Sequence, residues 1–335
     1  MTSQAATFPR TMRAARCVAH GRDVPLAYGQ LPLPTAGEGE VLIQVEACGL
    51  NVADDLMRAG RYQVRLTPPF TPGLEVAGAV AAVGPGIHGF EVGDPVVATV
   101  DGGGLADYAI ARATSAFPRP ETMDAMTAAA VLVSYGTADI ALTRRARLQP
   151  DETLVVFGAG GVLGQATIAL ARAKGATVIA AARSAEARER AVAAGAQLCL
   201  DSGSARLLDA VLAATGGRGA QVVVDPVGDP GFGTALRTAG FNGRILTVGF
   251  AGGGVPSVPL NLLLVKNLNL MGVFWGGHVS MEPDVVRTSI AATFSEITAG
   301  SLPVPGIDAY PLPDAQAAMD RLQESNGRKI AVDIR

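Results

Sequence analysis

The sequence predicts an α/β protein with two domains, one of which contains a doubly wound, six-stranded parallel sheet. Three observations lead to this prediction. The chain has 335 residues, which is too many for one ordinary core. Before residue 123, short β-rich runs are broken by Gly and Pro, and after it apolar strand-like runs alternate with helical segments. We therefore expect one domain at residues 1–123 and 276–335, and the other at residues 124–275.

The composition excludes several function classes. Hydrophobic residues make up 49% of the chain and charged residues 17%, which is typical of a well-buried globular protein. The net charge of −3 gives no basic field, so we expect no nucleic-acid partner. No apolar run reaches the roughly 20 residues that span a bilayer, so we expect no membrane partner. Cys17, Cys48 and Cys199 lie far apart and form no C-x-x-C pattern, which favours a reducing cytoplasm.

The first predicted domain is a compact, mostly antiparallel β domain, because its β-rich runs are short and separated by turn residues. These runs are "EVLIQVEACGL", "LEVAGAVAAVG", "GDPVVATV" and "LADYAIA". The tail of the chain adds a helix in "EPDVVRTSIAATFSEITAG", an extended run, a helix in "PDAQAAMDRLQE" and a strand in "KIAVDI". We expect this tail, from about Gly276, to rejoin the first domain.

The central domain is predicted from six apolar strand candidates with five helical segments between them. Continuous apolar strands joined by helices indicate a parallel sheet that is covered on both faces, and six strands match the doubly wound dinucleotide-binding fold. The six candidates are "TLVVF", "ATVIAAA", "AQLCL", "QVVVD", "RILTVGF" and "LNLMGVF".

A glycine loop, "VVFGAGGVLG", follows the first of these strands. Counted from Gly158 it is one residue too long for the dinucleotide fingerprint, but Ala159-x-Gly161-x-x-Gly164 has the correct spacing. In this register Gly161 lets the backbone approach a pyrophosphate, and Gly164 lets the helix pack on the strand. The N-terminus of the helix supplies N–H groups and positive partial charge for the phosphates.

The identity of the dinucleotide is predicted from the end of the second strand. An acidic residue there binds the ribose 2′-hydroxyl of NAD, but this chain reads "VIAAARSAE". Arg183 can bind a 2′-phosphate through a charge-assisted fork, and Ser184 can donate a hydrogen bond. We therefore expect NADPH, while a solvated arginine at a strand end stays open as the alternative.

The chain resembles the medium-chain dehydrogenase/reductase superfamily and, more narrowly, its zinc-independent NADPH:quinone oxidoreductases, the zeta-crystallin-like branch. The motifs that carry the resemblance, besides the glycine loop, are "EACGLNVADDLMRAGRY" (Glu46–Tyr62), "PFTPGLEVAGAVAAVGPGI" (Pro69–Ile87), "GDPVVA" (Gly93–Ala98), "SYGTA" (Ser134–Ala138), "DPVG" (Asp225–Gly228) and "KNLNLMGVFWG" (Lys266–Gly276). The resemblance implies a GroES-like β domain formed by both chain ends and a Rossmann domain between them.

The resemblance also implies that there is no catalytic zinc. Zinc-dependent members of the superfamily hold the metal with Cys, His and a further Cys or Asp, and only Cys48 matches this set. Leu74 replaces the histidine, and Ala129 falls near the second cysteine. We expect Cys48 to be a small buried hydrophobe. Two departures from the family pattern are Val162, where relatives tend to carry glycine, and Leu56, where some carry tyrosine.

By resemblance, the expected activity is hydride transfer from NADPH to a quinone or another electron-poor conjugated carbonyl. A 2-enoyl thioester or 2-alkenal reductase is the first alternative, and an NADPH-binding, crystallin-like protein without significant catalysis is the second. We expect a homodimer that pairs through the last Rossmann strand. The expected substrate-site residues are Asn51, Asp54 and Tyr62. The expected cofactor-binding residues are Tyr135, Thr137, Ala159, Gly160, Gly161, Val162, Leu163, Gly164, Arg183, Ser184, Phe250, Phe274, Trp275 and Arg328, with Asn326 and Lys329 as further candidates.

Overall fold

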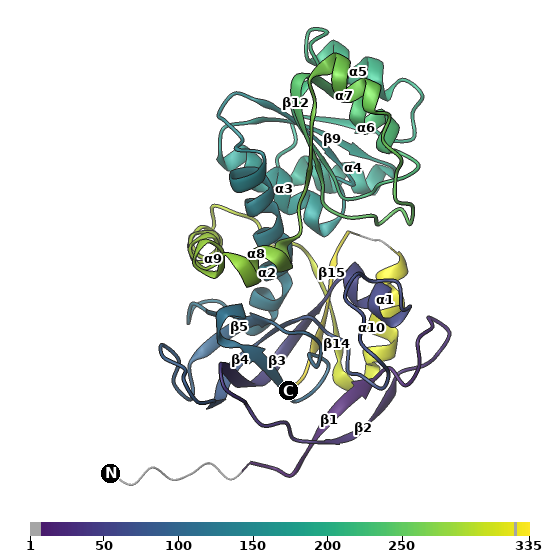
Figure 1. The fold of residues 1–335 in the computed structure, drawn as a ribbon. Helices are drawn as coiled ribbons and strands as arrows, with labels where there is room; N and C mark the ends of the chain where they lie inside the picture. Colours follow the sequence, from purple (N-terminus) through teal and green to yellow (C-terminus); the bar gives the residue numbers. More distant parts are fainter. Residues whose placement is uncertain (1–7, 325–326) are drawn as a thin grey trace. The chain divides into compact units, whose positions relative to one another are not determined.

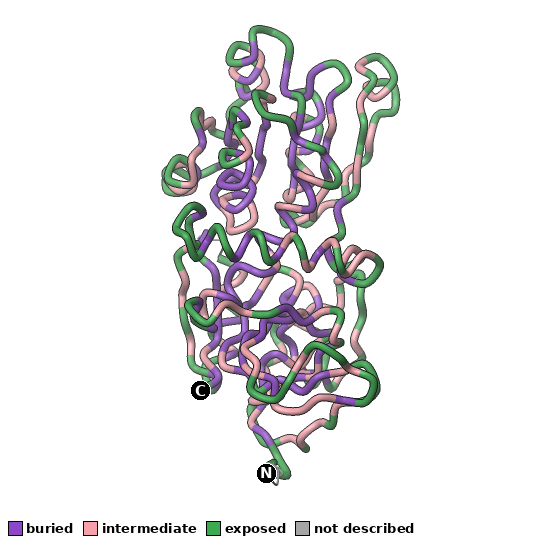
Figure 2. The backbone as a smooth tube through the Cα atoms, turned by 90° about the vertical axis from the view of Figure 1, so that its left-hand side faces the viewer, coloured by how far each residue is buried: buried purple, intermediate pink, exposed green. Residues whose placement is uncertain are grey.

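A computed structural model describes residues 8–324 and 327–335 of the chain. The chain forms two compact units (Figure 1). Unit 1 contains the residues up to Leu132, Ile307–Glu324 and Lys329–Arg335. Unit 2 contains Val133–Gly306, together with Gly327 and Arg328 among the described residues. In both units the buried residues follow the strands and the inner helix faces, and the exposed residues follow the loops (Figure 2).

Unit 1 is built on a seven-stranded sheet in which all pairs are antiparallel except β14 with β15. The order is β14-β15-β3-β4-β5-β7, and β6 pairs with β3. A separate pair, β1 with β2, completes the unit. The strands are β1 (Thr11–Arg16), β2 (Ala27–Pro32), β3 (Glu40–Leu50), β4 (Glu75–Val83), β5 (Pro95–Thr99), β6 (Tyr108–Arg112), β7 (Ala116–Pro118), β14 (Ile307–Pro311) and β15 (Lys329–Asp333). The prediction of a mostly antiparallel β domain is therefore confirmed.

The core of unit 1 lies between this sheet and the short helix α10 (Ala315–Arg321), while the short helix α1 (Val52–Arg58) packs through Met57 in a separate, smaller cluster. The core is made of small β-branched and aliphatic side chains from alternate strand positions, such as Val41, Ile43 and Val45. The strands approach closely at Gly78, where an added Cβ would lie 2.0 Å from the carbonyl oxygen of Gln44. Three-residue 3₁₀ turns at Ala113–Ser115, Leu312–Asp314 and Leu322–Glu324 connect the elements.

Unit 2 contains the predicted parallel sheet of six strands, in the order β10-β9-β8-β11-β12-β13. This is the doubly wound order, with a topological switch point between β8 and β11. The strands are β8 (Thr153–Phe157), β9 (Thr177–Ala182), β10 (Leu198–Asp201), β11 (Ala220–Asp225), β12 (Ala239–Thr247) and β13 (Asn269–Gly272). All six match the apolar runs in the sequence, so the fold class is confirmed.

Helices follow each strand of this sheet, as a parallel sheet requires. The helices between the strands are α3 (Val162–Ala173), α4 (Ala185–Ala193), α5 (Leu207–Ala214), α6 (Phe232–Thr238) and α7 (Leu260–Lys266). Two more, α8 (Trp275–Met281) and α9 (Pro283–Thr298), come after the last strand. The five connecting helices are those that the sequence predicts.

The two units divide at different residues from the predicted domains. Only β14, α10 and β15 of the tail belong to unit 1, whereas α8 and α9 belong to unit 2. One reason is visible in α9, whose Ser289 donates a 2.6 Å hydrogen bond to Asp139. The predicted return at residue 276 relied on a change of pattern, but the chain leaves unit 2 only after Gly306.

The helix α2 (Ala125–Asp139) continues as a π-helical segment, Ile140–Arg145, and unit 1 ends inside it at Leu132. By length and composition alone, Ala125–Arg145 could cross a membrane. Most of it is buried inside the protein, which is typical of a core helix. All three cysteines are free.

Candidate functional site

The carboxyl edge of the parallel sheet gathers the predicted cofactor residues of unit 2. The glycine loop follows β8, Arg183 and Ser184 follow β9, Phe250 follows β12, and Phe274 follows β13. Because all six strands are parallel, their carboxyl ends lie at one edge of the sheet. Ligands of such sheets bind at this edge, next to the switch point.

The glycine loop needs its glycines for three different contacts. A Cβ on Gly164 would lie 2.4 Å from the carbonyl oxygen of Gly158 and 2.7 Å from Cα of Ala159, so Gly164 lets α3 pack directly on the strand end. A Cβ on Gly160 would lie 2.5 Å from Cβ of Ala187, in α4. Gly158 itself has a φ of +58°, in the left-handed region. The register starting at Ala159 accounts for Gly164, whereas Gly158 and Gly160 lie outside its specified positions.

The first turn of α3 presents backbone donors. Gly161 is the N-cap residue, and its own N–H donates to the carbonyl of Gly158. Val162, Leu163 and Gly164 are the first three helical residues, so their N–H groups have no partner within the helix. Val162 has helical geometry and is half-buried, so this position of the loop does not require glycine. The helix start is thus arranged to bind an anion.

The glycine loop makes hydrogen bonds with residues that were not predicted from the sequence. The carbonyl oxygen of Gly160 accepts hydrogen bonds from Gln165 Nε2, at 3.0 Å, and from Arg190 Nε, at 3.1 Å. Gln165 Nε2 also donates to the carbonyl of Gly327, at 2.7 Å. A Cβ on Gly327 would lie 2.1 Å from the Gly160 oxygen. A segment far along the chain therefore packs on the glycine loop.

The end of β9 has the expected arginine and one acidic neighbour. Arg183 is exposed, while Ser184 is the N-cap of α4 and its Oγ accepts from the N–H of Ala187 at 3.1 Å. The pKa of Glu186 is lowered by hydrogen bonds from its own backbone amide and from the Ser184 hydroxyl. Arg188 folds back and donates to the carbonyl of Arg183 at 2.8 Å, which adds a second cation that we did not predict.

Turns after β11 and β12 pack on each other at the same edge. Asp225 is buried, and one of its carboxylate oxygens accepts from the N–H groups of Val227 and Gly228 at 2.8 and 3.2 Å. Burial raises its pKa, against the effect of these two hydrogen bonds. A Cβ on Gly228 would lie 3.1 Å from the ring of Phe250, which is half-buried. Phe274 is exposed at the end of β13.

Three residues of the predicted cofactor set lie within the body of unit 2. Tyr135 is buried and its hydroxyl donates to the carbonyl of Pro303, so this hydroxyl is committed inside the unit. Thr137 is also buried. The Trp275 ring packs on Gly136, where an added Cβ would lie 2.8 Å from the indole. All three side chains are buried at or beside α2, and the cofactor contact that the resemblance implies for them stays a prediction.

The cofactor-binding candidates near the C-terminus, Asn326, Arg328 and Lys329, differ in their surroundings. Arg328 is exposed, and its guanidinium lies beside Gly306. Asn326 lies outside the described residues. Lys329, by contrast, is the first residue of β15 in unit 1 and is buried.

Unit 1 brings Asn51 together with two buried charges. Lys329 Nζ lies 2.7 Å from Glu75 Oε2 and donates to Asn51 Oδ1 at 2.8 Å. Asn51 Nδ2 donates to the same Glu75 oxygen at 2.9 Å. Glu75 is completely buried and Lys329 is 2% exposed, whereas Asn51 is only half-buried. Asn51 is therefore the one member of this charged triangle that is not fully buried.

The carboxylate of Asp54 holds the backbone of Asn51. Its Oδ2 accepts from the N–H of Asn51 at 2.8 Å, and its Oδ1 accepts from the N–H of Gly73 at 3.0 Å. The side chain is completely buried. This differs from the expectation that Asp54 lies in the substrate cleft, because both oxygens bind the backbone and none is exposed.

Burial raises the pKa of Asp54 to about 6, from 3.8, against the effect of its backbone hydrogen bonds. The native state therefore binds this proton more tightly than the unfolded chain. Below about pH 4, Asp54 is protonated in both the native and the unfolded state, and its contribution to the free energy of unfolding is fully present. As the pH rises through about 6, the native state also loses the proton and this contribution is lost.

Asp54→Asn cannot titrate at this position, so we expect a comparison of the wild type with this variant to isolate the contribution of the Asp54 proton to stability. The free energy of unfolding of the wild type, relative to that of the variant, is expected to fall by up to about 3 kcal/mol between pH 4 and pH 7. Urea denaturation of both proteins across this range measures it. A difference that is flat or rises with pH would contradict the assignment.

Tyr62 lies in an apolar cluster beside α1. The cluster contains buried Cys17, Met57 and Phe70, with Tyr62, Leu66, Leu74 and Leu26 partly buried around them. Burial raises the pKa of Tyr62, and the charge of Asp54 raises it further. The Tyr62 ring thus borders an aliphatic and aromatic surface, which suits a flat, apolar molecule.

Cys48 is completely buried, as expected. A Cβ atom added to Gly73 would lie 2.7 Å from the Cys48 sulfur, and one added to Gly104 would lie 2.9 Å from it. The backbone of these two glycines therefore packs directly against the sulfur. Burial raises the pKa of the thiol well above its usual range. No group of three or more His, Cys, Asp or Glu side chains that could hold a metal ion lies within residues 8–324 and 327–335.

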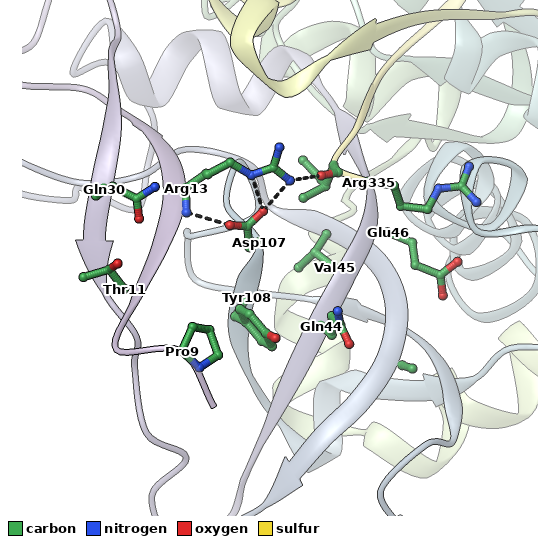
Figure 3. Close-up of a pocket in the computed structure, with 12 residues that line it drawn as sticks. Pro9, Thr11, Arg13, Gln30, Gln44, Val45, Glu46, Asp107, Tyr108 and Arg335 are labelled. Atoms are coloured by element: carbon green, nitrogen blue, oxygen red, sulfur yellow. Dashed lines mark hydrogen bonds and ion pairs between the residues drawn. The ribbon is translucent and has the colours of Figure 1, made fainter. Parts of the chain in front are cut away.

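An open pocket of about 610 Å³ lies elsewhere in unit 1 (Figure 3). Arg13 crosses it and donates to Asp107 Oδ1 at 2.8 Å and to the carbonyl of Ile334 at 2.7 Å. Gln30, Gln44, Glu46 and Tyr108 line the pocket with it. None of the predicted site residues belongs to this pocket, and its central charges neutralise each other.

The sequence matches two protein families in neighbouring segments. Residues 37–121 match the alcohol dehydrogenase GroES-like domain, and residues 162–291 match the zinc-binding dehydrogenase family. Both matches fall on the units with the corresponding folds. The second match begins at Val162, within the glycine loop.

Relatives of the chain cover almost all of it. Quinone oxidoreductase-like protein 2 of Mus musculus is 38% identical over 84% of this chain and 80% of its own length. Quinone oxidoreductase of Rattus norvegicus is 30% identical over 96% of this chain and 97% of its own. A mycobacterial protein, Rv1454c, solved in complex with NADPH, is 28% identical, covers 96% of this chain with 100% of its own, and has a TM-score of 0.89.

The family thus follows from sequence and fold together. A GroES-like antiparallel unit is interrupted in sequence by a doubly wound sheet with a dinucleotide loop, and the relatives share both parts. This chain is an oxidoreductase of the medium-chain dehydrogenase/reductase superfamily, similar to its quinone oxidoreductases.

Proposed function

We propose that the chain is an NADPH-dependent reductase that transfers hydride to a quinone, or another electron-poor conjugated carbonyl, without a metal. The observation that carries the proposal is in unit 1, where half-buried Asn51 binds Glu75 and the residue directly before Glu75, Leu74, belongs to the apolar cluster of Tyr62. This combination suits a flat acceptor with a carbonyl oxygen. The bound nicotinamide would supply the hydride, and the protein would orient the acceptor and exclude water.

The donor set around Cys48 supports a reaction without zinc. A catalytic zinc needs three protein ligands with lone pairs, and neither Leu74 nor Ala129 offers one in its side chain. The thiol of Cys48 is enclosed by the glycines described above. The residues present therefore do not fit a catalytic zinc, although the matched family is described as zinc-binding. Quinones and enones suit such a site because their reduced forms need little Lewis-acid help.

The residues at the end of β9 favour NADPH over NADH as the cofactor. Arg183 is exposed there without an ion pair to any described residue, and the position of the usual acid is taken by Ala182. Glu186 opposes this preference, because a carboxylate near Ser184 repels a 2′-phosphate. We therefore expect NADPH to bind more tightly than NADH through Arg183 above all.

Replacing Arg183 by alanine is expected to weaken NADPH binding about 10- to 100-fold, the value of a charge-assisted hydrogen bond, and to leave NADH binding nearly unchanged. Calorimetric titration of each cofactor measures this. Arg237→Ala is the matched control, because it removes an equally exposed arginine from the last turn of α6. Equal affinities for both cofactors in the wild type would remove the NADPH assignment.

Steady-state assays rank the acceptors. With NADPH, kcat/KM is expected to be higher for 1,4-benzoquinone than for crotonyl-CoA or a 2-alkenal. A higher value for the thioester or the alkenal would make the chain an enoyl or alkenal reductase instead. NADPH binding without turnover of any acceptor would favour a binding protein.

We also propose a homodimer that forms through β13. This strand is at the end of the sheet order, so one of its edges is free. Large apolar side chains are exposed on it and on the neighbouring α7, with Leu264 and Leu260 both more than 70% exposed and Leu270 37% exposed. An exposed edge strand with an apolar surround favours pairing with a second copy.

Leu264→Glu combined with Leu270→Glu is expected to convert the dimer into a monomer at micromolar concentration, because the substitutions place charges on the proposed interface. Light scattering after size-exclusion chromatography measures the mass. Val192→Glu is the control, since Val192 is similarly exposed but lies on α4. A wild-type monomer would refute the proposal.

A further inference from the structure

The side-chain amide of Asn51 has a fixed orientation. Its Oδ1 accepts from Lys329, and its Nδ2 donates to Glu75. If the amide were flipped, Nδ2 would face the ammonium group, which only donates, and Oδ1 would face the carboxylate, which only accepts. Both contacts would be repulsive. The two charges therefore determine which end of the amide is oxygen and which is nitrogen.

The triangle leaves one donor for a ligand. An asparagine amide carries two N–H groups on Nδ2, and one of them is used by Glu75. No described residue accepts the other. Asn51 is half-buried while its two partners are buried, so it is the only member of the triangle with surface that a ligand can reach.

The backbone of Asn51 is fixed as well. Asp54 holds its N–H, Glu75 is the first residue of β4, and Lys329 is the first residue of β15. The starts of two strands thus meet at the Asn51 side chain, while Asp54 of α1 holds its backbone. Burying two charges is costly, and such a pair is weak evidence for stability alone. This cost makes a role in positioning worth testing.

We propose that Lys329, together with Glu75, is a positioning residue that aims the remaining Nδ2–H of Asn51 at the acceptor's carbonyl oxygen. This rests on the proposed function. When an acceptor is reduced, a C–H bond of the bound nicotinamide would break and the hydride would form a C–H bond on a conjugated carbon of the acceptor. The electron pair moves to the acceptor's oxygen, which takes a proton from water. A quinone then becomes its hydroquinone when this carbon returns one proton to water and the second oxygen takes one up. A fixed N–H that points at the oxygen receiving the electron pair stabilises the charge without reorganising.

A double-mutant cycle tests the proposal with NADPH and 1,4-benzoquinone. Glu75→Gln/Lys329→Met removes both charges together, which avoids leaving one charge buried alone. Asn51→Ala removes the donor and is expected to lower kcat about 100-fold. The neutralised pair is expected to lower kcat about tenfold by the same principle, because the amide can then rotate. NADPH affinity is expected to stay within twofold.

The decisive measurement is the combination of all three substitutions. If Lys329 acts through Asn51, the triple variant has the kcat of Asn51→Ala, with no further loss. Multiplied losses, about 1000-fold in all, would overturn the proposal and leave the pair with a structural role. Asp101→Asn/Arg112→Met neutralises an exposed pair in the same unit and is the control, with kcat expected to be unchanged.

A second readout separates this proposal from the proposed function. In protein labelled with ¹⁵N in the asparagine amides, the Asn51 signals are identified by their loss in Asn51→Ala. Glu75→Gln/Lys329→Met is expected to shift these signals and to speed their exchange with solvent. Unchanged signals would overturn the positioning role. If the wild type reduces no acceptor but the signals shift, the proposed function fails while the fixed amide stands.

Discussion

Replacing Gly164 by alanine is expected to weaken NADPH binding about 10- to 100-fold and to lower the free energy of unfolding by about 1–3 kcal/mol. The added Cβ would meet the Gly158 oxygen at 2.4 Å and Cα of Ala159 at 2.7 Å. Both are backbone atoms of the loop, so they cannot rotate away. The start of α3 must move from the strand, and its N–H groups then no longer converge on the phosphates.

Gly233→Ala is the matched control for this substitution. Gly233 lies in α6, and an added Cβ would meet no atom within 4 Å. Because alanine favours a helix over glycine, this variant is expected to be as stable as the wild type or up to about 1 kcal/mol more stable. Urea denaturation and NADPH titration of the two variants measure both effects. If Gly164→Ala bound NADPH like Gly233→Ala, the loop would not be the cofactor site.

The parallel sheet could be predicted from the sequence because each of its strands is a continuous apolar run. Val155 and Val156 are neighbours in β8 and face opposite sides of the sheet, yet both are completely buried, which is typical of a strand covered on both faces. The glycine loop could also be predicted, since the spacing of its glycines between a strand and a helix is local, whereas its contacts with Arg190 and Gly327 could not. In contrast, the return of the chain to unit 1 was placed too early, because α9 has an ordinary amphipathic sequence that does not reveal what it packs on.

The candidate site was only partly predictable, for a physical reason. Asn51 could be chosen from its motif, but its partners Glu75 and Lys329 lie 24 and 278 positions away. The family resemblance placed Asp54 in the substrate cleft, but its carboxylate is completely buried and accepts from the N–H of Gly73. Such assignments depend on which strands become neighbours, and local pattern does not contain this information.

Lys329→Met is expected to lower the free energy of unfolding by about 3–5 kcal/mol, because it leaves the Glu75 carboxylate buried without its counter-charge. Glu75 is completely buried and its Oε2 lies 2.7 Å from the ammonium nitrogen. Glu75→Gln/Lys329→Met removes both charges and is expected to recover most of this loss. Lys329→Met should therefore be less stable than Glu75→Gln/Lys329→Met. If the effects of the two substitutions were additive losses, the double variant would be the less stable one.

Arg112→Met separates burial from the mere loss of an ion pair. Arg112 and Asp101 form a pair at 3.3 Å in the same unit, but their side chains are 65% and 82% exposed. Water already solvates both groups, so this variant is expected to cost no more than about 1 kcal/mol. Urea denaturation of the three variants at one pH gives the comparison. If Lys329→Met cost no more than Arg112→Met, water would have to reach Glu75, and the charges could not hold the Asn51 amide in one orientation.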